Sequence, residues 1–170
     1  FLAKELLKRK LNYSYRFLFA PETIGSLVWL NLRQRKLSNI KLGLVARCLG
    51  DRGIMHYKKS RAGNAFIDRA VEKVLADSKN PYKILDFSPT GGDERQFCSP
   101  GFNLPMGTLM RTPDGKYPEY HTSADNLNFI SPKHLQDSLR KYLDIINFVE
   151  NSKIYQSTNP KGEPRLGKRG

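Results

Sequence analysis

Short apolar segments alternate with amphipathic helical patterns along most of this 170-residue sequence. Short runs rich in aromatic and aliphatic residues predict strands, at residues 13–19, 42–49, 82–87 and 103–110. Apolar residues at helical spacing predict helices, at residues 1–10, 23–36, 63–75 and 131–149. This alternation favours a largely parallel or mixed sheet with helices on both faces. The expected fold class is therefore α/β, a three-layer αβα sandwich.

The best-marked helix begins at Ser131-Pro132. Serine is a preferred N-cap and proline is favoured in the first helical turn. Apolar residues then continue at helical spacing, namely Leu135, Leu139, Leu143, Ile146 and Val149. Thr23 is the corresponding cap for the second helix, with Leu27 and Leu30 in its apolar stripe.

The amino-acid composition limits which classes of protein this chain can belong to. A hydrophobic content of 39% over 170 residues is enough to bury the core of one domain. No apolar run approaches the roughly 20 residues of a membrane span, and the N-terminus lacks the arrangement of a secretory signal. Cys48 and Cys98 fit no CxxC pattern, so a reduced, cytoplasmic compartment is expected, with a single disulfide as the alternative. We therefore expect a soluble globular protein with no membrane partner.

The net charge of +13 is concentrated at the two ends of the chain. Residues 1–61 carry 14 Lys and Arg against 3 Asp and Glu, residues 62–150 carry 10 against 12, and residues 151–170 carry 5 against 1. Basic blocks attract phosphate backbones and other anionic surfaces, but cations near helix C-termini also favour the helix dipole. Solvated helix ends and a nucleic-acid or other acidic partner therefore both fit the charge.

Polar residues that can carry chemistry follow the predicted strands. Glu22 follows the first strand, Asp51 the second and Asp93-Glu94 the third, while His121 lies in the loop beyond the fourth. Functional residues of open α/β sheets gather at the C-terminal ends of the strands. Carboxylates and an imidazole there could bind zinc and deprotonate water. A surface histidine and ordinary turn carboxylates are the alternative interpretation.

Three segments, in their order along the chain, carry a family resemblance. They are Tyr15-Arg-Phe-Leu-Phe-Ala-Pro-Glu-Thr-Ile-Gly-Ser26, Gly91-Gly-Asp-Glu-Arg-Gln-Phe97 and Tyr120-His-Thr-Ser-Ala-Asp125. They resemble the strand and Glu-Glu-x-Gly turn, the Ser-Asp-His-x-x-Phe segment and the Tyr-His-Thr-x-x-Asp motif of the co-catalytic zinc aminopeptidases. The resemblance covers nearly all of residues 1–150. It implies a zinc-exopeptidase-like fold and a zinc-dependent hydrolase that acts on a peptide or amide bond.

The resemblance also implies roles for individual residues. His121 corresponds to a zinc-binding histidine, and Asp93 to an aspartate that supports the hydrogen bonds of the active site. When Gly25 is matched to the glycine of the Glu-Glu-x-Gly turn, Glu22 becomes the general base and Thr23 replaces a zinc-binding glutamate. The other register, shifted by one residue, leaves no residue that can act as the base.

Arg47 marks a departure from the family pattern. When Gly50 is matched to the family's Asp-x-x-Gly, Arg47 replaces the aspartate ligand, and Asp51 is the nearest carboxylate that could substitute as a metal ligand. The family's first motif, a histidine and a metal-bridging aspartate, is expected before residue 1. Arg61 offers a cationic contact for a substrate carboxylate, with a basic loop as the alternative. The site is thus either a modified zinc site or that of a catalytically impaired relative.

Two further segments resemble the sequences of one bacterial branch of this family, namely Tyr57-Lys-Lys-Ser-Arg61 and Cys98-Ser-Pro-Gly-Phe-Asn-Leu-Pro105. Its members are described as aminopeptidase-like proteins associated with polysaccharide biosynthesis. There a winged-helix domain follows, so we expect residues 1–150 to be the C-terminal portion of an aminopeptidase-like domain and residues 151–170 to be a linker. The alternative function is a scaffold or regulator that binds nucleic acid or another acidic partner, through its basic ends or a downstream winged helix.

Overall fold

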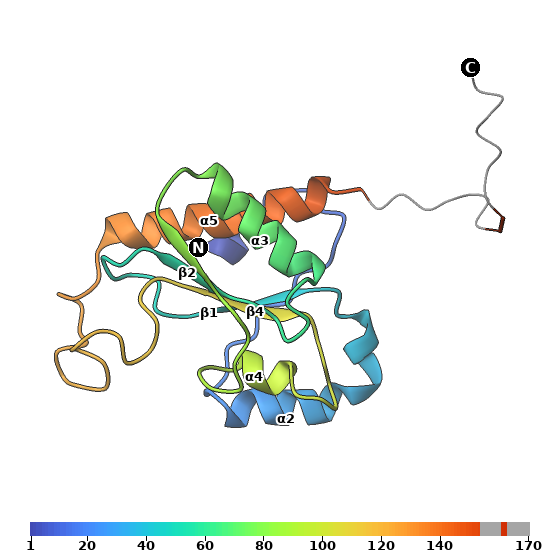
Figure 1. Ribbon diagram of the computed structural model, residues 1–170, viewed down its shortest axis with the longest axis horizontal. Helices are drawn as coiled ribbons and strands as arrows, with labels where there is room; N and C mark the ends of the chain where they lie inside the picture. The colour runs from blue at the N-terminus through green and yellow to red at the C-terminus, as the bar shows by residue number, and fades with distance from the viewer. Residues whose placement is uncertain (154–160, 163–170) are drawn as a thin grey trace, which may run out of the picture.

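The computed structural model describes residues 1–153 and 161–162, so most of the expected linker lies outside the described residues. The described part contains a four-stranded sheet as its middle layer (Figure 1). Its strands are β1 (Gly43–Ala46), β2 (Met55–Lys58), β3 (Tyr82–Leu85) and β4 (Met106–Met110), in the order β1-β4-β2-β3. The pairs β1–β4 and β2–β3 are parallel, whereas β2 and β4 are antiparallel. The sheet is therefore mixed and mostly parallel, as predicted.

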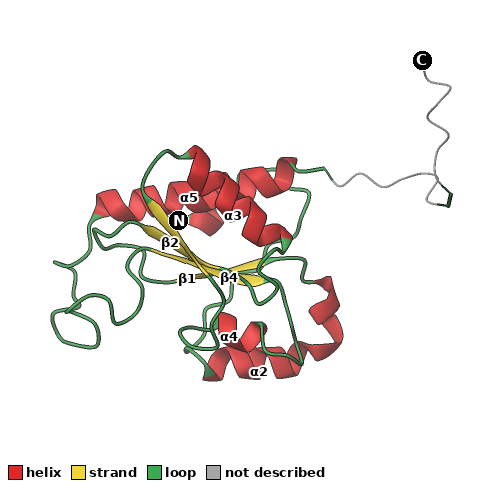
Figure 2. Cartoon of the chain, viewed as in Figure 1, coloured by secondary structure: helices red, strands yellow, loops and turns green. Residues whose placement is uncertain are grey.

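Helices cover both faces of the sheet (Figure 2). One face carries α3 (Phe66–Asp77) and α5 (Pro132–Asn151), with α1 (Leu2–Leu6) beside α5. The other face carries α2 (Ile24–Arg33), which continues into the 3-10 helix η1 (Gln34–Asn39), and α4 (Glu94–Phe97). The predicted αβα sandwich is confirmed. None of the helices in the described part of the chain has the length and apolarity needed to cross a lipid bilayer.

Each helical layer packs an apolar core against the sheet. On the α3–α5 side the core contains Tyr57, Ile67, Leu75, Leu109 and Ile145. On the α2–α4 side it contains Leu30, Phe97, Cys98, Leu104 and Met106. Removing this apolar surface from water is the main favourable contribution to folding. The sheet is thereby held between two layers, with its strand-end loops left for polar residues.

The helix α5 begins where the sequence predicted. Ser131 is its N-cap and accepts a hydrogen bond from the amide of His134, and Pro132 is its first residue. Ile146 and Val149 of the predicted stripe are buried, but Leu135 is 42% exposed, and Tyr142, outside the stripe, is buried instead. Contact with α3 and the sheet, rather than apolarity alone, selects the face that a helix buries.

The strand predicted at residues 13–19 is wrong. This segment forms no ladder, and its Phe19 side chain is 90% exposed. It is attached instead to Glu150 on α5, whose carboxylate accepts hydrogen bonds from the Tyr13 amide and the Tyr15 hydroxyl. A strand requires a pairing partner, and a local pattern of aromatic residues does not supply one.

The strand β2 occupies residues for which the sequence analysis predicted no strand. It lies between β4 and β3, so both Tyr57 and Lys58 are buried. Lysine is rarely buried unless it is paired, and Lys58 is paired with Glu94 on α4. The polar and charged residues of β2 explain why the sequence analysis did not predict this central strand.

Candidate active site

Arg47 directly follows β1 and lies at the centre of a polar cluster. Its Nη2 lies 2.5 Å from Oδ2 of Asp114, and its Nη1 lies 3.6 Å from Oε1 of Glu22. Asp114 belongs to the loop after β4, the parallel neighbour of β1, so both side chains lie at the same edge of the sheet. Burial lowers the pKa of Arg47, but the carboxylates of Asp114 and Glu22 more than offset this, and the pKa lies above its ordinary value. The cluster therefore contains a permanent positive charge.

Thr23 holds the neighbouring Glu22 through a strained turn. Its φ of 64° and ψ of −65°, with a 2.7 Å hydrogen bond from the Ile24 amide to the Glu22 carbonyl, define a γ-turn that is rare for a β-branched residue. Oδ1 of Asp93 accepts 2.7 Å hydrogen bonds from the Thr23 amide and the Ser26 hydroxyl. These bonds fix the turn while the Glu22 side chain stays 58% exposed.

Glu94 places a third carboxylate close to the Arg47 guanidinium. Its Oε1 lies 2.8 Å from Nζ of Lys58, and both side chains are buried. Its Oε2 is enclosed and has no hydrogen-bond partner among the described residues. A Cβ on Gly92 would lie 2.0 Å from Nη1 of Arg47 and 3.0 Å from Oε2 of Glu94, so only glycine fits here. A bound water or ligand would satisfy the unpartnered oxygen.

The loop between β4 and α5 carries His121. Sγ of Cys48 lies 3.7 Å from Oδ1 of Asp114 and 3.7 Å from the hydroxyl of Tyr117. The Tyr117 ring meets Tyr120 edge-on, and Tyr120 in turn stacks on His121 with ring centroids 3.9 Å apart. His121 is exposed, adopts a φ of 58°, and its ring forms no hydrogen bond with another described residue. Aromatic packing thus connects the His121 loop to the cluster, without a direct polar contact.

Asp51 and Arg61 lie in other surroundings. Asp51 is buried, and its Oδ1 accepts hydrogen bonds from the amide of Gly53 at 2.7 Å and from the hydroxyl of Thr112 at 2.6 Å. The Nε of Arg61 donates to the carbonyl of Cys98, and its guanidinium lies 4.8 Å from the ring centroid of Phe87. Asp51 therefore closes a loop, whereas Arg61 rests on an aromatic surface.

The described residues do not fit a complete zinc site. Within the described part of the chain, no three His, Cys, Asp or Glu side chains gather to hold a metal ion. Arg47 places a cation where the resemblance expects a carboxylate ligand, and two cations at one position repel each other. Glu22 and Asp93 lie close together through Thr23, but neither forms a hydrogen bond with Asp51 or His121 among the described contacts.

Asp114 was missed by the sequence analysis, and so was Lys58 as the partner of Glu94. An arginine near the end of a predicted strand, where its guanidinium is partly buried, favours an acidic partner, so Arg47 was the available signal. The sequence offers many carboxylates, however, and the partner is determined by which loops meet at the sheet edge. Because the sequence analysis predicted no strand at β2, the burial of Lys58 and its need for Glu94 as a counterion were not predicted.

Residues 1–152 match the family model described as domain of unknown function DUF4910. The chain belongs to the DUF4910 family. A relative from Clostridium acetobutylicum is 56% identical over 170 residues, which is 100% of this DUF4910 chain and 39% of the relative. The name of that relative assigns it to polysaccharide biosynthesis and gives it an aminopeptidase-like domain. The chain thus spans about two fifths of that relative's length.

Solved structures agree with this placement. One is a crystal structure from Clostridium acetobutylicum that is named as a peptidase, with a TM-score of 0.88 and 55% identity. The match spans 99% of this DUF4910 chain and 40% of the chain in that crystal structure. The zinc aminopeptidase BSAP from Bacillus subtilis has a TM-score of 0.57 and 12% identity, over 76% of this chain and 34% of its own. The second likeness shows a shared fold only. The DUF4910 chain therefore has an aminopeptidase-like fold.

Proposed function

We propose that this DUF4910 chain is part of a hydrolase that cleaves a peptide or amide bond, with Glu22 as the proton-accepting carboxylate. The observation that carries the proposal is the placement of Glu22, whose exposed side chain stands on a turn fixed by Asp93 beside Arg47. A rigidly held carboxylate that is open to solvent can accept a proton from an attacking water. The names of the relatives support this class of reaction.

Other residues have supporting roles in this proposal. Arg47 orients the Glu22 carboxylate through their 3.6 Å contact. Asp93 is a positioning residue, because it bonds to the Thr23 amide and the Ser26 hydroxyl instead of facing solvent. Arg61 is the proposed contact for a substrate carboxylate, since a guanidinium can bind both carboxylate oxygens at once.

Zinc is proposed as the cofactor because a structural neighbour is named as a zinc aminopeptidase. His121 and Asp51 are the ligands that this chain would contribute. The fit is incomplete, since the described residues gather no metal-binding group and the Asp51 carboxylate already accepts hydrogen bonds. A working site therefore requires ligands beyond those that the described residues bring together.

Glu22→Gln in the intact protein tests the proposal, with Glu72→Gln on α3 as a matched control. Zinc content is measured on the purified protein, and activity on a panel of aminoacyl p-nitroanilides. We expect bound zinc and a loss of at least about 100-fold in kcat for Glu22→Gln, because general-base catalysis contributes about that much. Absence of zinc together with unchanged hydrolysis by Glu22→Gln would remove the proposal.

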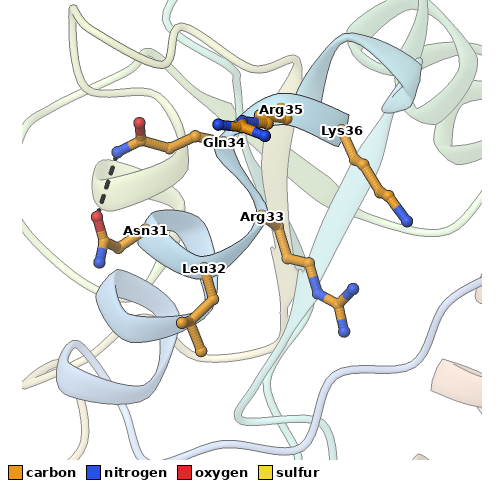
Figure 3. A pocket seen from close by; sticks show the side chains of 6 residues that line it. All are labelled: Asn31, Leu32, Arg33, Gln34, Arg35 and Lys36. Carbon is orange, nitrogen blue, oxygen red and sulfur yellow. Dashed lines mark hydrogen bonds between the residues drawn. The ribbon is translucent and has the colours of Figure 1, made fainter.

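A basic patch favours a second candidate function, a scaffold or regulator that binds nucleic acid or another acidic partner. Arg33, Arg35 and Lys36, with Asn31 and Gln34, surround a surface pocket of about 300 Å³ at the junction of α2 and η1 (Figure 3). The three cations are exposed, and none forms an ion pair with another described residue. Unpaired cations on one surface can neutralise phosphates and release their counterions.

Reversing these charges tests the second function. Fluorescence anisotropy with labelled DNA is measured at about 50 and 200 mM salt, the range in which phosphate contacts lose affinity. If the patch binds DNA, the triple change of Arg33, Arg35 and Lys36 to Glu removes most of the binding. The matched control reverses the same number of exposed cations at Arg69, Lys79 and Lys83. Equal effects of the two triple variants, or no binding at the lower salt, would rule out this patch.

A further inference from the structure

A cationic pocket lies on the α3–α5 side of the sheet and shares no lining residue with the cluster around Arg47. It has a volume of about 270 Å³ and lies between the C-terminal end of α3, the first turns of α5 and the starts of β2 and β3. Its apolar wall includes the solvent-accessible side chains of Ile54, Pro81 and Tyr82. Its charged wall comprises Arg111, Lys133, Asp137 and Lys141. The pocket therefore combines an apolar side with several cations.

Lys141 is the unusual residue of this pocket. It is only 5% exposed, yet it forms no hydrogen bond or ion pair with another described residue. Its ammonium is not fully enclosed by protein atoms, so it can be reached from the pocket that Lys141 lines. An unpaired cation in a buried position is costly. The pocket is thus where a counterion for Lys141 can lie.

The acid that would ordinarily pair with Lys141 is already engaged. Asp137 lies one helical turn earlier on α5, at the spacing that favours an ion pair. Its Oδ2 instead lies 2.5 Å from Nη2 of Arg111, a buried residue that also donates to the Ser138 hydroxyl and the Gly53 carbonyl. Arg111 is therefore neutralised and fixed in place, and the charges left without a partner are those of Lys141 and the exposed Lys133.

We propose that this pocket binds a small organic carboxylate with an apolar tail. The carboxylate pairs with the Lys141 ammonium, which lines the pocket from α5. The tail lies against Ile54, Pro81 and Tyr82. The apolar wall can bury a tail that inorganic phosphate lacks, so the pocket favours an amphiphilic anion over a compact one. This binding is independent of the proposed hydrolysis, because no residue is shared.

Calorimetry of the intact protein with three probes tests the ligand class. The probes are hexanoate, which has both charge and tail, 1-hexanol, which has the tail alone, and inorganic phosphate, which has the charge alone. We expect hexanoate to bind at least about tenfold more tightly than either of the others, as a charge-assisted hydrogen bond predicts. Equal binding of 1-hexanol would show an apolar pocket only, and preferred binding of phosphate would show a simple anion site. Either result, or no hexanoate binding, overturns the proposal.

The variant Lys141→Met tests whether Lys141 is the residue that binds the carboxylate. Methionine keeps an unbranched stem and removes the charge, so the fold should survive and hexanoate affinity should fall by about tenfold or more. The control is Lys73→Met on α3, whose lysine pairs with Asp77 outside the pocket. Hexanoate affinity that is unchanged in Lys141→Met contradicts the assignment. Should that variant fail to fold, the comparison of hexanoate with 1-hexanol on the native protein still decides the proposal.

Discussion

The carboxylate of Asp93 accepts a 2.7 Å hydrogen bond from the backbone amide of Thr23, a residue 70 positions earlier in the chain. This bond joins the loop before α4 to the turn before α2, on one face of the sheet. Thr23 adopts a backbone conformation that its own side chain disfavours, so the turn depends on this distant acceptor. The direction of the neighbouring Glu22 therefore depends on Asp93.

Asp93→Ala should reduce the free energy of unfolding by about 1–3 kcal/mol, because the Thr23 amide and the Ser26 hydroxyl both lose their acceptor. Urea unfolding followed by circular dichroism measures the change. The control is Asp86→Ala, at an exposed aspartate after β3. A loss no larger than that of the control would show that the turn does not need Asp93.

Gly92→Ala should also destabilise the protein, by about 1–3 kcal/mol, because the new methyl group overlaps the guanidinium of Arg47. Arg47 would have to move and would weaken its contact with Asp114. Gly101→Ala is the control, since a Cβ at Gly101 meets no atom within 4 Å. Thermal unfolding of both variants measures the difference, and equal stability of the two would contradict the close approach of Gly92 to Arg47.

Lys58→Met should cost about 3–5 kcal/mol, because it leaves the buried carboxylate of Glu94 without its counterion. The double variant Lys58→Met with Glu94→Met should recover to within about 1–2 kcal/mol of the native protein, since it removes both charges. Denaturant unfolding of the two single variants and the double variant forms a complete cycle. Additive losses would mean that the two side chains do not interact.

The segment at residues 12–15 should detach from α5 in acid. Partial burial raises the pKa of Glu150, but hydrogen bonds from the Asn12 amide, the Tyr15 hydroxyl and the Tyr13 amide outweigh it, so the net pKa is lowered. A carboxyl group whose pKa is lower in the folded state stabilises it above the unfolded pKa, and this stabilisation is lost as the pH falls through the folded pKa.

An NMR titration of the Glu150 carboxyl, with hydrogen exchange at the Tyr13 amide, measures this effect. We expect the carboxyl to titrate below its ordinary value of 4.5, and the amide to lose protection over the same acidic range. Glu150→Gln should abolish this pH dependence of protection. Titration at or above the ordinary value would contradict the hydrogen bonds seen at this carboxylate.

Local patterns predicted the helices better than the strands. In α3, Ile67, Val71 and Leu75 form the buried face at the spacing that the sequence showed, because helical periodicity is a property of neighbouring residues. The aromatic segment at residues 13–19 looked like a strand but has no pairing partner, while the charged β2 became a central strand. Strand pairing joins residues that are distant in sequence, so composition alone does not reveal it.

For the candidate site, the sequence and its family resemblance nominated Glu22, Asp93 and His121 and showed the replacement at Arg47. They also determined the αβα fold class, the capped start of α5 and the excess of basic charge at the ends. Tertiary structure decided the contacts: Asp114 as the partner of Arg47, Glu94 as that of Lys58 and Asp137 as that of Arg111. The physical reason is that apolar periodicity is encoded within one segment, whereas an ion pair depends on which distant loops and helices the packed sheet brings together.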